Sequence, residues 1–331
     1  MRILVTGADG FIGSHLTEKL SKLGYQVTAL CYYNSFNSIG NLAYLEKKTL
    51  QRIEIIHGDL RDNSFIENLI KGKDFVFNLA ALIGIPYSFK AYNSYLETNI
   101  KGTLNILTGI KKYPSTFLIH TSTSEVYGSA QYIPMDEKHP LVAQSPYAAS
   151  KIAADQFVGS FNKSFGIGSC TIRPFNTFGP RQSSRAIIPT AINQIIKKPK
   201  KIFFGNLNTV RDLTYIDDTI NAYCLCLKNK NRINGETINL GIGKGYLIKD
   251  VINRVIKLEK SSSKIIISKD RIRPNSSEVD KLISSNNTAK KLLKWIPKYK
   301  NSKDFNKALF ETIEWFKKNS NQSEDHKKYI I

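Results

Sequence analysis

The sequence predicts an α/β protein in which a doubly wound parallel sheet is followed by a smaller C-terminal α/β domain. Short apolar runs alternate with longer amphipathic segments from residue 2 onward, as in repeated βαβ units. The apolar runs lack a strict polar alternation, which is typical of strands buried on both faces. A glycine-rich turn also joins the first apolar run to the first amphipathic segment. Together these observations favour one parallel sheet with helices on both faces.

The elements follow one another regularly over the first half of the chain. From about Asn176 the chain is richer in Pro, Arg and Asn, which indicates a smaller domain beside the carboxyl ends of the strands. The expected strands are 2–6, 25–31, 53–59, 74–81, 116–123 and 167–175, and the expected helices are 12–24, 64–72, 93–113 and 145–166. The predicted domains are 1–173 with 210–243 returning to it, then 174–209 with 244–320, and finally a flexible tail at 321–331.

The composition is that of a globular protein. The chain has 331 residues, of which 41% are hydrophobic, enough for a substantial core. It contains no apolar run of about 18 residues and no leader pattern, so we expect a cytoplasmic protein that does not bind a membrane. The four cysteines lie in apolar contexts without histidine partners nearby. The sequence therefore predicts neither a metal site nor disulfides.

The formal net charge of +21 raises the alternative of a nucleic-acid-binding protein, because a cationic surface attracts polyphosphates. The basic residues are mostly lysines scattered along the chain, without an aromatic-interleaved patch or a binding motif. We therefore predict no nucleic-acid partner. A basic surface would still gather an anionic small-molecule substrate.

The first turn has the spacing of a dinucleotide-binding loop. Gly7, Gly10 and Gly13 are spaced G-x-x-G-x-x-G between a strand and a helix. Glycine permits a tight turn and a close backbone approach to a pyrophosphate, which then lies at the positive end of the helix. The turn therefore predicts a Rossmann-type domain that binds NAD or NADP. Asp59 after the third strand and the small residues of NLAA (78–81) after the fourth are placed to line the same cofactor.

One expected feature of such a site is missing. An acidic residue at the end of the second strand normally holds the hydroxyls of the adenosine ribose. Here that strand ends TALCYYNSFNS, with Cys31 in the expected place and no acid before Glu46. No arginine stands there for a 2′-phosphate either. The sequence favours NAD and leaves NADP open.

Tyr147 and Lys151 form a candidate catalytic pair, because residues i and i+4 lie one turn apart on the same helix face. Two unit charges about 4 Å apart at an effective dielectric of about 20 interact by roughly 4 kcal/mol, equivalent to about three pKa units. We therefore expect Lys151 to make the Tyr147 phenolate accessible near neutral pH. The spacing could arise by chance, but its place on the helix after the polar stretch TSTSEVYG (121–128) favours catalysis.

Six motifs make the chain resemble the extended short-chain dehydrogenase/reductase family over nearly its whole length. They are TGADGFIG, NLAA, TSTSEVYG, YAASK, RPFNTFGPRQ and RDLTYIDD, in the family's order. The resemblance implies a Rossmann domain with a small C-terminal substrate domain, a homodimer, and an enzyme that acts on a nucleotide-diphosphate sugar. The implied cofactor-binding set is Gly7, Gly10, Phe11, Ile12, Gly13, Asp59, Leu60, Ala80, Ala81, Asn99, Tyr147 and Lys151.

Within this family the stretch TSE indicates the reaction. Simple 4-epimerases typically carry a small or apolar residue at the position of Glu125, whereas 4,6-dehydratases carry Thr, then Asp or Ser, then Glu. Thr123, Ser124 and Glu125 match the Ser version, as in GDP-mannose 4,6-dehydratases. The resemblance implies that Tyr147, assisted by Lys151 and Thr123, takes the C4 hydroxyl proton while hydride passes to the cofactor. Glu125 then removes the C5 proton, water leaves from C6 and hydride returns to C6, with Ser124 relaying or positioning.

Longer stretches such as YNSFNS, IGIPYSF and QSPYAASKIAADQ resemble the dehydratases of the legionaminic acid pathway, which implies GDP- or UDP-linked N-acetylglucosamine as the substrate. Arg211 and Arg273 lie where family members bind the pyrophosphate, for which arginine offers a bidentate fork. Further substrate-binding candidates are Asn176, Arg181 and Glu278. The alternatives left open are a nucleotide-sugar 4-epimerase, a UDP-glucuronate decarboxylase, which also carries Thr-Ser-Glu, and a non-catalytic redox-sensing module.

Overall fold

The computed structural model describes residues 1–268, 271 and 279–319, and its centre is a parallel sheet of seven strands. The strand order is β10-β6-β5-β4-β1-β2-β3, so the order reverses between β1 and β4. Neighbouring strands all pair in parallel. The strands are Arg2–Thr6 (β1), Gln26–Tyr32 (β2), Ile53–Gly58 (β3), Phe75–Asn78 (β4), Phe117–Thr121 (β5), Ser169–Pro174 (β6) and Thr237–Leu240 (β10). This confirms the predicted doubly wound α/β fold.

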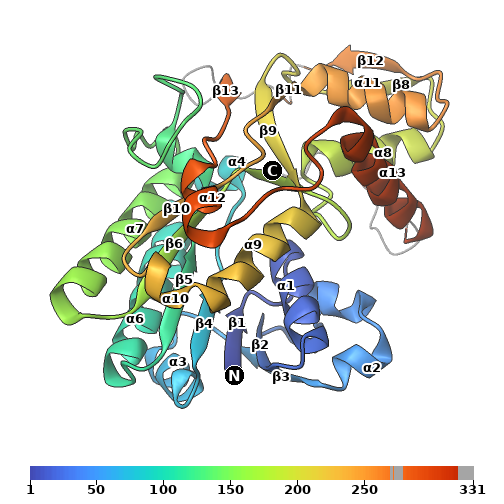
Figure 1. Ribbon diagram of the computed structural model, residues 1–331. Coiled ribbons are helices and arrows are strands. Elements are labelled where there is room, and N and C mark those ends of the chain that lie inside the picture. Colours follow the sequence, from blue (N-terminus) through green and yellow to red (C-terminus); the bar gives the residue numbers. More distant parts are fainter. Residues whose placement is uncertain (269–270, 272–278, 320–331) are drawn as a thin grey trace.

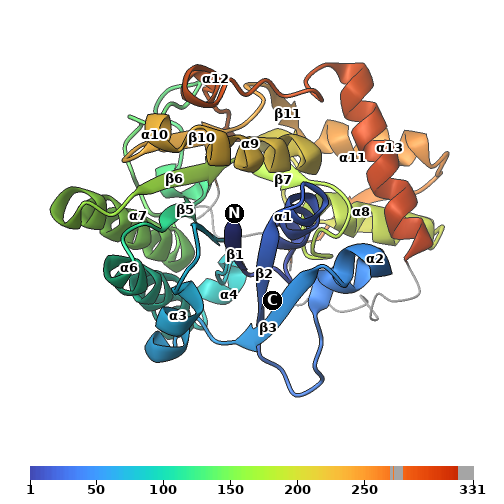
Figure 2. The same ribbon diagram turned by 60° about the horizontal axis from the view of Figure 1, so that its bottom comes forward.

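Helices cover both faces of this sheet (Figure 1 and Figure 2). One face carries α3 (Asn63–Ile70), α6 (Gly102–Lys112) and α7 (Pro146–Phe165), and the other carries α1 (Phe11–Lys22) and α9 (Ile216–Lys228). Because both faces are covered, consecutive residues of a strand are buried, as Ile3, Leu4 and Val5 of β1 are. The catalytic candidates on α7 are fixed by its start: the side chain of Ser145 accepts the amide of Ala148, and Pro146 opens the first turn.

A smaller domain lies beside the carboxyl ends of the main strands. One of its sheets contains β7 (Asn176–Phe178), β9 (Val210–Tyr215), β11 (Gly245–Leu247) and β13 (Lys281–Leu282), and another pairs β8 (Lys201–Phe204) with β12 (Lys264–Ile267). The helices α8 (Ile187–Ile196), α11 (Ile248–Leu258) and α13 (Ser302–Lys318) pack near the second of these sheets (Figure 1). The other helical segments are η1 (Gly40–Tyr44), α2 (Lys47–Leu50), α4 (Ile85–Ser88), α5 (Tyr92–Tyr95), η2 (Leu96–Lys101), η3 (Ser124–Tyr127), α10 (Lys230–Ile233) and α12 (Asn287–Leu293).

One strand pairs outside the main sheet, although the sequence analysis expected its segment to return to the first domain. The sequence placed 210–215 with the first domain, but β9 pairs with β7, β11 and β13 in the smaller domain. The chain returns to the main sheet only with α9 and β10. The two parts share an apolar core, in which the ring of Phe178 lies 5.3 Å from that of Phe305. The predicted tail at 321–331 lies outside the described residues.

Two further observations concern the described ranges. Within 1–268, 271 and 279–319, no helix is both long and apolar enough to cross a membrane. The same residues include no group of three or more His, Cys, Asp or Glu side chains that could hold a metal ion.

Candidate active site

The candidate site lies at the carboxyl ends of the main strands, around the point where the strand order reverses. The glycine turn follows β1, Asp59 follows β3, Ala80 and Ala81 follow β4, and the stretch 121–128 begins at the end of β5. Ligands of open α/β sheets bind in the crevice at this edge. The topology therefore brings the predicted cofactor and catalytic residues together, although they are far apart in the sequence.

The glycine turn is shaped for a diphosphate. Gly7 has a φ of +64°, and a Cβ there would lie 2.8 Å from the amide nitrogen of Ala80. A Cβ on Gly13 would clash with the carbonyl oxygen of Gly7. Gly10 is the N-cap of α1 and no side chain caps this helix, so its first amides, at Phe11 and beyond, are available to an anion. These residues fit the pyrophosphate of a dinucleotide.

Two other predicted cofactor residues have structural contacts of their own. Asn99, on η2, is 1% exposed, and its side chain accepts from the amide of Leu82 (2.9 Å) and donates to the carbonyl of Leu82 (3.0 Å) and to Ser150 Oγ (2.9 Å). Asn99 therefore ties the segment after β4 to α7, the helix that carries the catalytic candidates. Leu60 is buried, and its carbonyl accepts from Asn105.

An acid that the sequence analysis missed lies at the end of β2. Asp9, in the glycine turn, accepts a hydrogen bond from the amide of Tyr32 at 3.2 Å. Burial raises the pKa of the Cys31 thiol to about 12, and the nearby charge of Asp9 adds to this shift. Asp9 thus supplies a carboxylate where the strand itself has none.

Asp59, which follows the neighbouring strand β3, forms an ion pair with Arg61, with 2.5 Å between Arg61 Nη2 and Asp59 Oδ2.

The predicted catalytic residues meet at the start of α7. Tyr147 and Lys151 are 7% and 3% exposed, and Lys151 Nζ donates to the carbonyl of Thr121 at 2.7 Å. Thr123 Oγ1 accepts from the amide of Glu125 at 3.2 Å, and the Thr123 side chain also hydrogen-bonds Tyr147. The charge of Glu125 acts on the Tyr147 phenol as well. The structure therefore brings these groups together as one constellation.

Ser124 differs from its two neighbours. Its side chain is buried, with 3% of its surface exposed, whereas Thr123 and Glu125 are half-buried. Along η3 the side chain of Ser124 therefore faces the protein interior, whereas Thr123 and Glu125 are partly exposed to solvent. This favours a positioning role for Ser124 over direct contact with a substrate.

The protonation states correct one expectation. Burial raises the pKa of Tyr147 above its ordinary value; the hydrogen bond with Thr123 opposes this, and the charge of Glu125 adds to it. Burial also lowers the pKa of Lys151 to about 8, against the charge of Asp155. Desolvation favours the neutral form of both groups. Burial therefore acts against the lowering of the Tyr147 pKa that the sequence prediction assigned to Lys151, because that prediction neglected burial.

Two substrate-binding candidates share a face of the smaller domain. Asn176 on β7 pairs with Leu213 on β9, and Arg211 is two residues before Leu213. Side chains at i and i+2 of a strand point to the same face, so Asn176 and Arg211 lie on one face of this sheet. Asn176 Oδ1 is buried without a hydrogen-bond partner among the described residues, which suits a ligand donor. Arg273 and Glu278 lie outside the described residues.

Arg181 has a structural partner on α1, while its Nε and Nη1 are buried without a hydrogen-bond partner among the described residues. Its Nη2 lies 2.6 Å from Glu18 Oε2 on α1, and the two side chains are 10% and 18% exposed. This ion pair links the segment after β7 to the first helix. Arg185, by contrast, is close enough to Tyr95 for its charge to oppose the effect of burial on the pKa of that phenol. The ring of Tyr95 packs edge-on against Tyr147, with 6.2 Å between centroids.

Arg181→Met is expected to lower stability without weakening substrate binding. The change leaves the partly buried Glu18 with Lys22 as its remaining ion-pair partner, which should cost about 1–2 kcal/mol in the free energy of unfolding. Urea unfolding and steady-state kinetics measure the two effects. A rise in KM of about tenfold or more at unchanged stability would instead place Arg181 at the substrate.

Comparison with known proteins gives a consistent family. Residues 4–307 match the sequence profile of a family described as GDP-mannose 4,6 dehydratase. A putative UDP-glucose 4-epimerase of Methanocaldococcus jannaschii is 32% identical over 263 residues, which is 78% of this chain and 82% of the relative. A UDP-N-acetyl-α-D-glucosaminuronate decarboxylase of Bacillus cytotoxicus is 30% identical over 329 residues, covering 97% and 99% of the two chains. The crystal structure of a dTDP-glucose 4,6-dehydratase from Bacillus anthracis, in complex with NAD, superposes with a TM-score of 0.81 at 27% identity and covers 97% and 98%.

Proposed function

The chain belongs to the GDP-mannose 4,6 dehydratase family, within the extended short-chain dehydrogenases/reductases, and from this premise we propose that it is a nucleotide-sugar 4,6-dehydratase. Its cofactor is NAD, as in the similar dehydratase solved with NAD. The proposed substrate is N-acetylglucosamine linked to GDP or UDP, and the product is the 4-keto-6-deoxy sugar.

The position of Glu125 carries the proposal. A 4-epimerase removes hydride from C4 and returns it there, so it needs a single base at the C4 hydroxyl. A 4,6-dehydratase must also remove the C5 proton and expel the C6 hydroxyl, which requires a second acid–base group. Glu125 is half-buried, and its charge acts on the Tyr147 phenol. One turn of η3 thus sets a carboxylate beside the phenol that oxidation requires.

The protein groups have separate duties in this reaction. Tyr147 accepts the proton of the C4 hydroxyl, and Thr123 orients that hydroxyl through the hydrogen bond it shares with Tyr147. Glu125 takes the C5 proton, which the new 4-ketone acidifies, and passes it to the C6 hydroxyl as water departs. The proton from Tyr147, after exchange with solvent, returns to C5. When bound, NAD supplies the redox chemistry by taking up hydride from C4 and returning it at C6.

The basic groups around the smaller domain suit the diphosphate. We assign Arg211 to the pyrophosphate and Asn176 to a phosphate or sugar hydroxyl, because the two lie on one face of the same sheet. Arg185 supplies a further cation next to Tyr95. Arg273 and Glu278 stay predictions of the sequence.

Incubation with GDP- and UDP-linked N-acetylglucosamine in D₂O, followed by NMR, tests the proposal. Dehydration gives a 4-keto-6-deoxy product with solvent deuterium at C5. An intact C6 hydroxyl with inverted C4 would establish a 4-epimerase instead. Release of CO₂ from UDP-glucuronate would establish a decarboxylase, the reaction type of the Bacillus cytotoxicus relative. Either result would reject the dehydratase.

We also propose that Asp9 replaces the missing strand-end acid and binds the adenosine ribose. Its carboxylate lies against the last residue of β2, where a 2′-phosphate would meet like charge. Asp9→Asn is expected to weaken NAD binding by about tenfold or more, because a hydrogen bond to a charged group is lost. Calorimetric titration with NAD and NADP measures this, and Glu97→Gln, whose side chain on η2 is 42% exposed, serves as the control. Unchanged NAD affinity would contradict the role of Asp9.

A further inference from the structure

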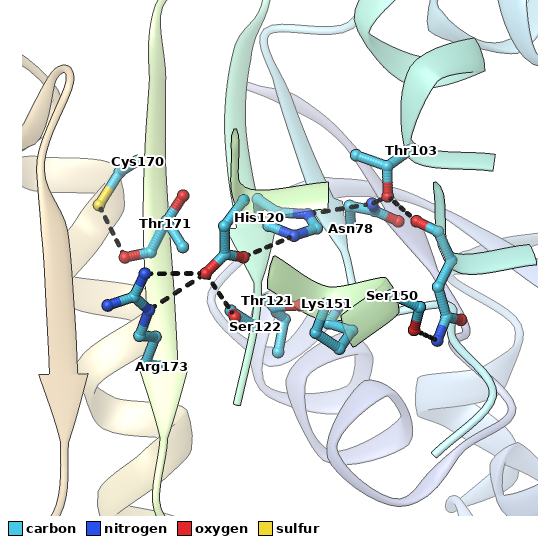
Figure 3. Close-up of polar contacts among 12 residues, drawn as sticks. Asn78, Thr103, His120, Thr121, Ser122, Ser150, Lys151, Cys170, Thr171 and Arg173 are labelled. Carbon is cyan, nitrogen blue, oxygen red and sulfur yellow. Dashed lines mark hydrogen bonds and ion pairs between the residues drawn. The ribbon is translucent and has the colours of Figure 1, made fainter. Parts of the chain in front are cut away.

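A buried polar network beneath the catalytic pair has no duty in the reaction described above. Its centre is the carboxylate of Asp155, one turn after Lys151 on α7 and 6% exposed. In Figure 3, dashed lines from Arg173, Ser122 and His120 converge on one carboxylate. Ser122 Oγ donates to Asp155 Oδ2 at 2.8 Å, and Arg173 Nε and Nη2 donate to the same oxygen at 3.1 and 3.0 Å. His120 Nε2 lies 3.5 Å from Asp155 Oδ1.

The network reaches the far end of the catalytic loop. Arg173 Nη1 donates to Tyr127 Oη at 3.0 Å, and Tyr127 Oη donates to Asn239 Oδ1 on β10 at 2.7 Å. Tyr127 is the last residue of η3, and Ser122 directly precedes Thr123. Both ends of the segment that carries Thr123 and Glu125 are therefore bound to the Asp155–Arg173 ion pair.

The network also reaches the glycine turn. Asn78 Nδ2, at the end of β4, lies 3.3 Å from His120 Nδ1 (Figure 3). Thr6 Oγ1 donates to Asn78 Oδ1 at 2.8 Å and accepts from the amide of Ala80 at 3.1 Å. Thr6 directly precedes Gly7. The network joins β1, β4, β5, β6 and α7, and buried polar networks of this kind rigidify the elements they join. His120 Nε2 and Asp155 Oδ1, which lie 3.5 Å apart, are buried without a hydrogen-bond partner among the described residues.

We propose that Asp155 is a positioning residue, which holds the loop of Thr123 and Glu125 against α7 and supplies the counter-charge of Lys151. Catalysis by oriented groups is sensitive to displacements of about 1 Å. A loop that is hydrogen-bonded at both ends keeps the carboxylate of Glu125 at a fixed position relative to the Tyr147 phenol. The proposal rests on the proposed function in one respect: Tyr147 and Lys151 are taken as the catalytic pair.

The charges of the network support this role. Burial lowers the pKa of His120, so its imidazole is neutral near pH 7. Asp155 then carries one negative charge against the cations of Lys151 and Arg173. Without Asp155 two buried cations would face each other, which is strongly unfavourable. With it, the cluster keeps one surplus positive charge, which ionisation of Tyr147 neutralises.

Asp155→Asn tests the proposal, because the amide keeps the shape and loses the charge. Removing a negative charge lowers the pKa of both Tyr147 and Lys151, and neighbouring charges typically shift pKa values by about 1–3 units. Both limbs of the kcat–pH profile should therefore move to lower pH, and kcat at the parent optimum should fall about tenfold or more. The Kd of NAD and the substrate KM should stay within about twofold. Hydrogen exchange of the amides in 121–127 should become faster.

Measuring cofactor reduction tests the positioning role of Asp155 separately from the proposed dehydratase function. Reduction of bound NAD by a sugar nucleotide, followed by absorbance, is common to dehydratases, epimerases and decarboxylases, so it reports on Tyr147 and Lys151 whichever final product forms. Asp250→Asn on the exposed face of α11 is the matched control. A folded Asp155→Asn protein with the parent's pH limbs and kcat would overturn the proposal. If the parent protein reduces no cofactor with any sugar nucleotide, the proposed function fails. The positioning role is then tested by hydrogen exchange alone: equal exchange of the amides 121–127 in the parent and in Asp155→Asn would overturn it.

If Asp155→Asn does not fold, the Ser122→Ala variant tests the positioning role of Asp155 instead. It removes the loop's direct bond to Asp155 and keeps the ion pair with Arg173. We expect kcat to fall by about two- to tenfold, as the loss of one hydrogen bond implies, with both pH limbs unmoved. If Ser122→Ala had the same kcat as the parent, the hydrogen bond between Ser122 and Asp155 would not position the loop for catalysis.

Discussion

The Glu125→Gln variant is expected to oxidise C4 of the sugar and then to stop. The glutamine amide has the size of the carboxylate, but it cannot accept the C5 proton or deliver a proton to the C6 hydroxyl. Loss of a general base typically costs about 10²–10⁴ in rate. Because the negative charge beside Tyr147 also disappears, the pKa of the phenol should fall, so the oxidation step itself should not be slowed. Reduced cofactor should therefore accumulate on the variant.

Two signals measure this outcome. NMR in D₂O should show neither a 4-keto-6-deoxy product nor deuterium at C5, while absorbance should show reduced nicotinamide after substrate is added. Glu97→Gln, which removes a surface charge on η2, should behave as the parent does. Full product formation by Glu125→Gln would remove Glu125 from the mechanism, and with it the argument for a dehydratase.

Glu125 separates a dehydratase from a simple 4-epimerase, a distinction that the shared fold does not make. The similar proteins include a putative epimerase, a decarboxylase and a dehydratase, so similarity alone does not decide among the three reactions. Each of these reactions can begin with removal of hydride from C4, for which Tyr147 and Lys151 suffice. What differs is the group that acts next, and in the proposed dehydratase reaction that group is Glu125, the half-buried carboxylate of η3.

Local patterns in the sequence predicted the parts of the site that lie within one element. The G-x-x-G-x-x-G spacing marks a turn that only glycine can form, and the i, i+4 spacing of Tyr147 and Lys151 fixes their shared helix face. The same spacing joins Lys151 to Asp155, so that residue could have been found by extending the pattern one turn further. The sequence does not reveal the role of Asp155, because its partners come from separate strands: Arg173 lies on β6 and His120 on β5.

Contacts between distant segments explain the remaining differences. Asp9 acts at the end of β2 because the glycine turn folds over that strand, a contact between residues 23 apart in sequence. Arg181 resembles a phosphate ligand by motif, and the structure adds an ion pair with Glu18 on α1 that the sequence did not reveal. The protonation of Tyr147 also depends on burial, which a pair of residues on a helix does not reveal.

Tyr147→Phe is expected to slow C4 oxidation strongly while leaving the fold intact. Phenylalanine keeps the edge-on contact with Tyr95 but cannot accept the C4 hydroxyl proton. The rate of cofactor reduction should fall by about 10²–10⁴. In the parent, Lys151 loses its proton above its pKa of about 8, so the oxidation rate should decline on the alkaline side. The residual rate of the variant should lack this decline, because no phenolate remains for the cation to stabilise.

Single-turnover absorbance over a range of pH measures both effects in the Tyr147→Phe variant. Tyr95→Phe is the matched control, because the Tyr95 ring packs edge-on against Tyr147. It loses the hydrogen bond from Tyr95 Oη to the carbonyl of Gly84 and keeps the Tyr147 phenol. Its rate should therefore fall far less than that of Tyr147→Phe. Equal losses in the two variants would mean that the aromatic packing, not proton transfer, limits oxidation. A Tyr147→Phe rate close to that of the parent would require another base at C4, and Glu125, the nearest carboxylate of η3, would then have to serve both carbons.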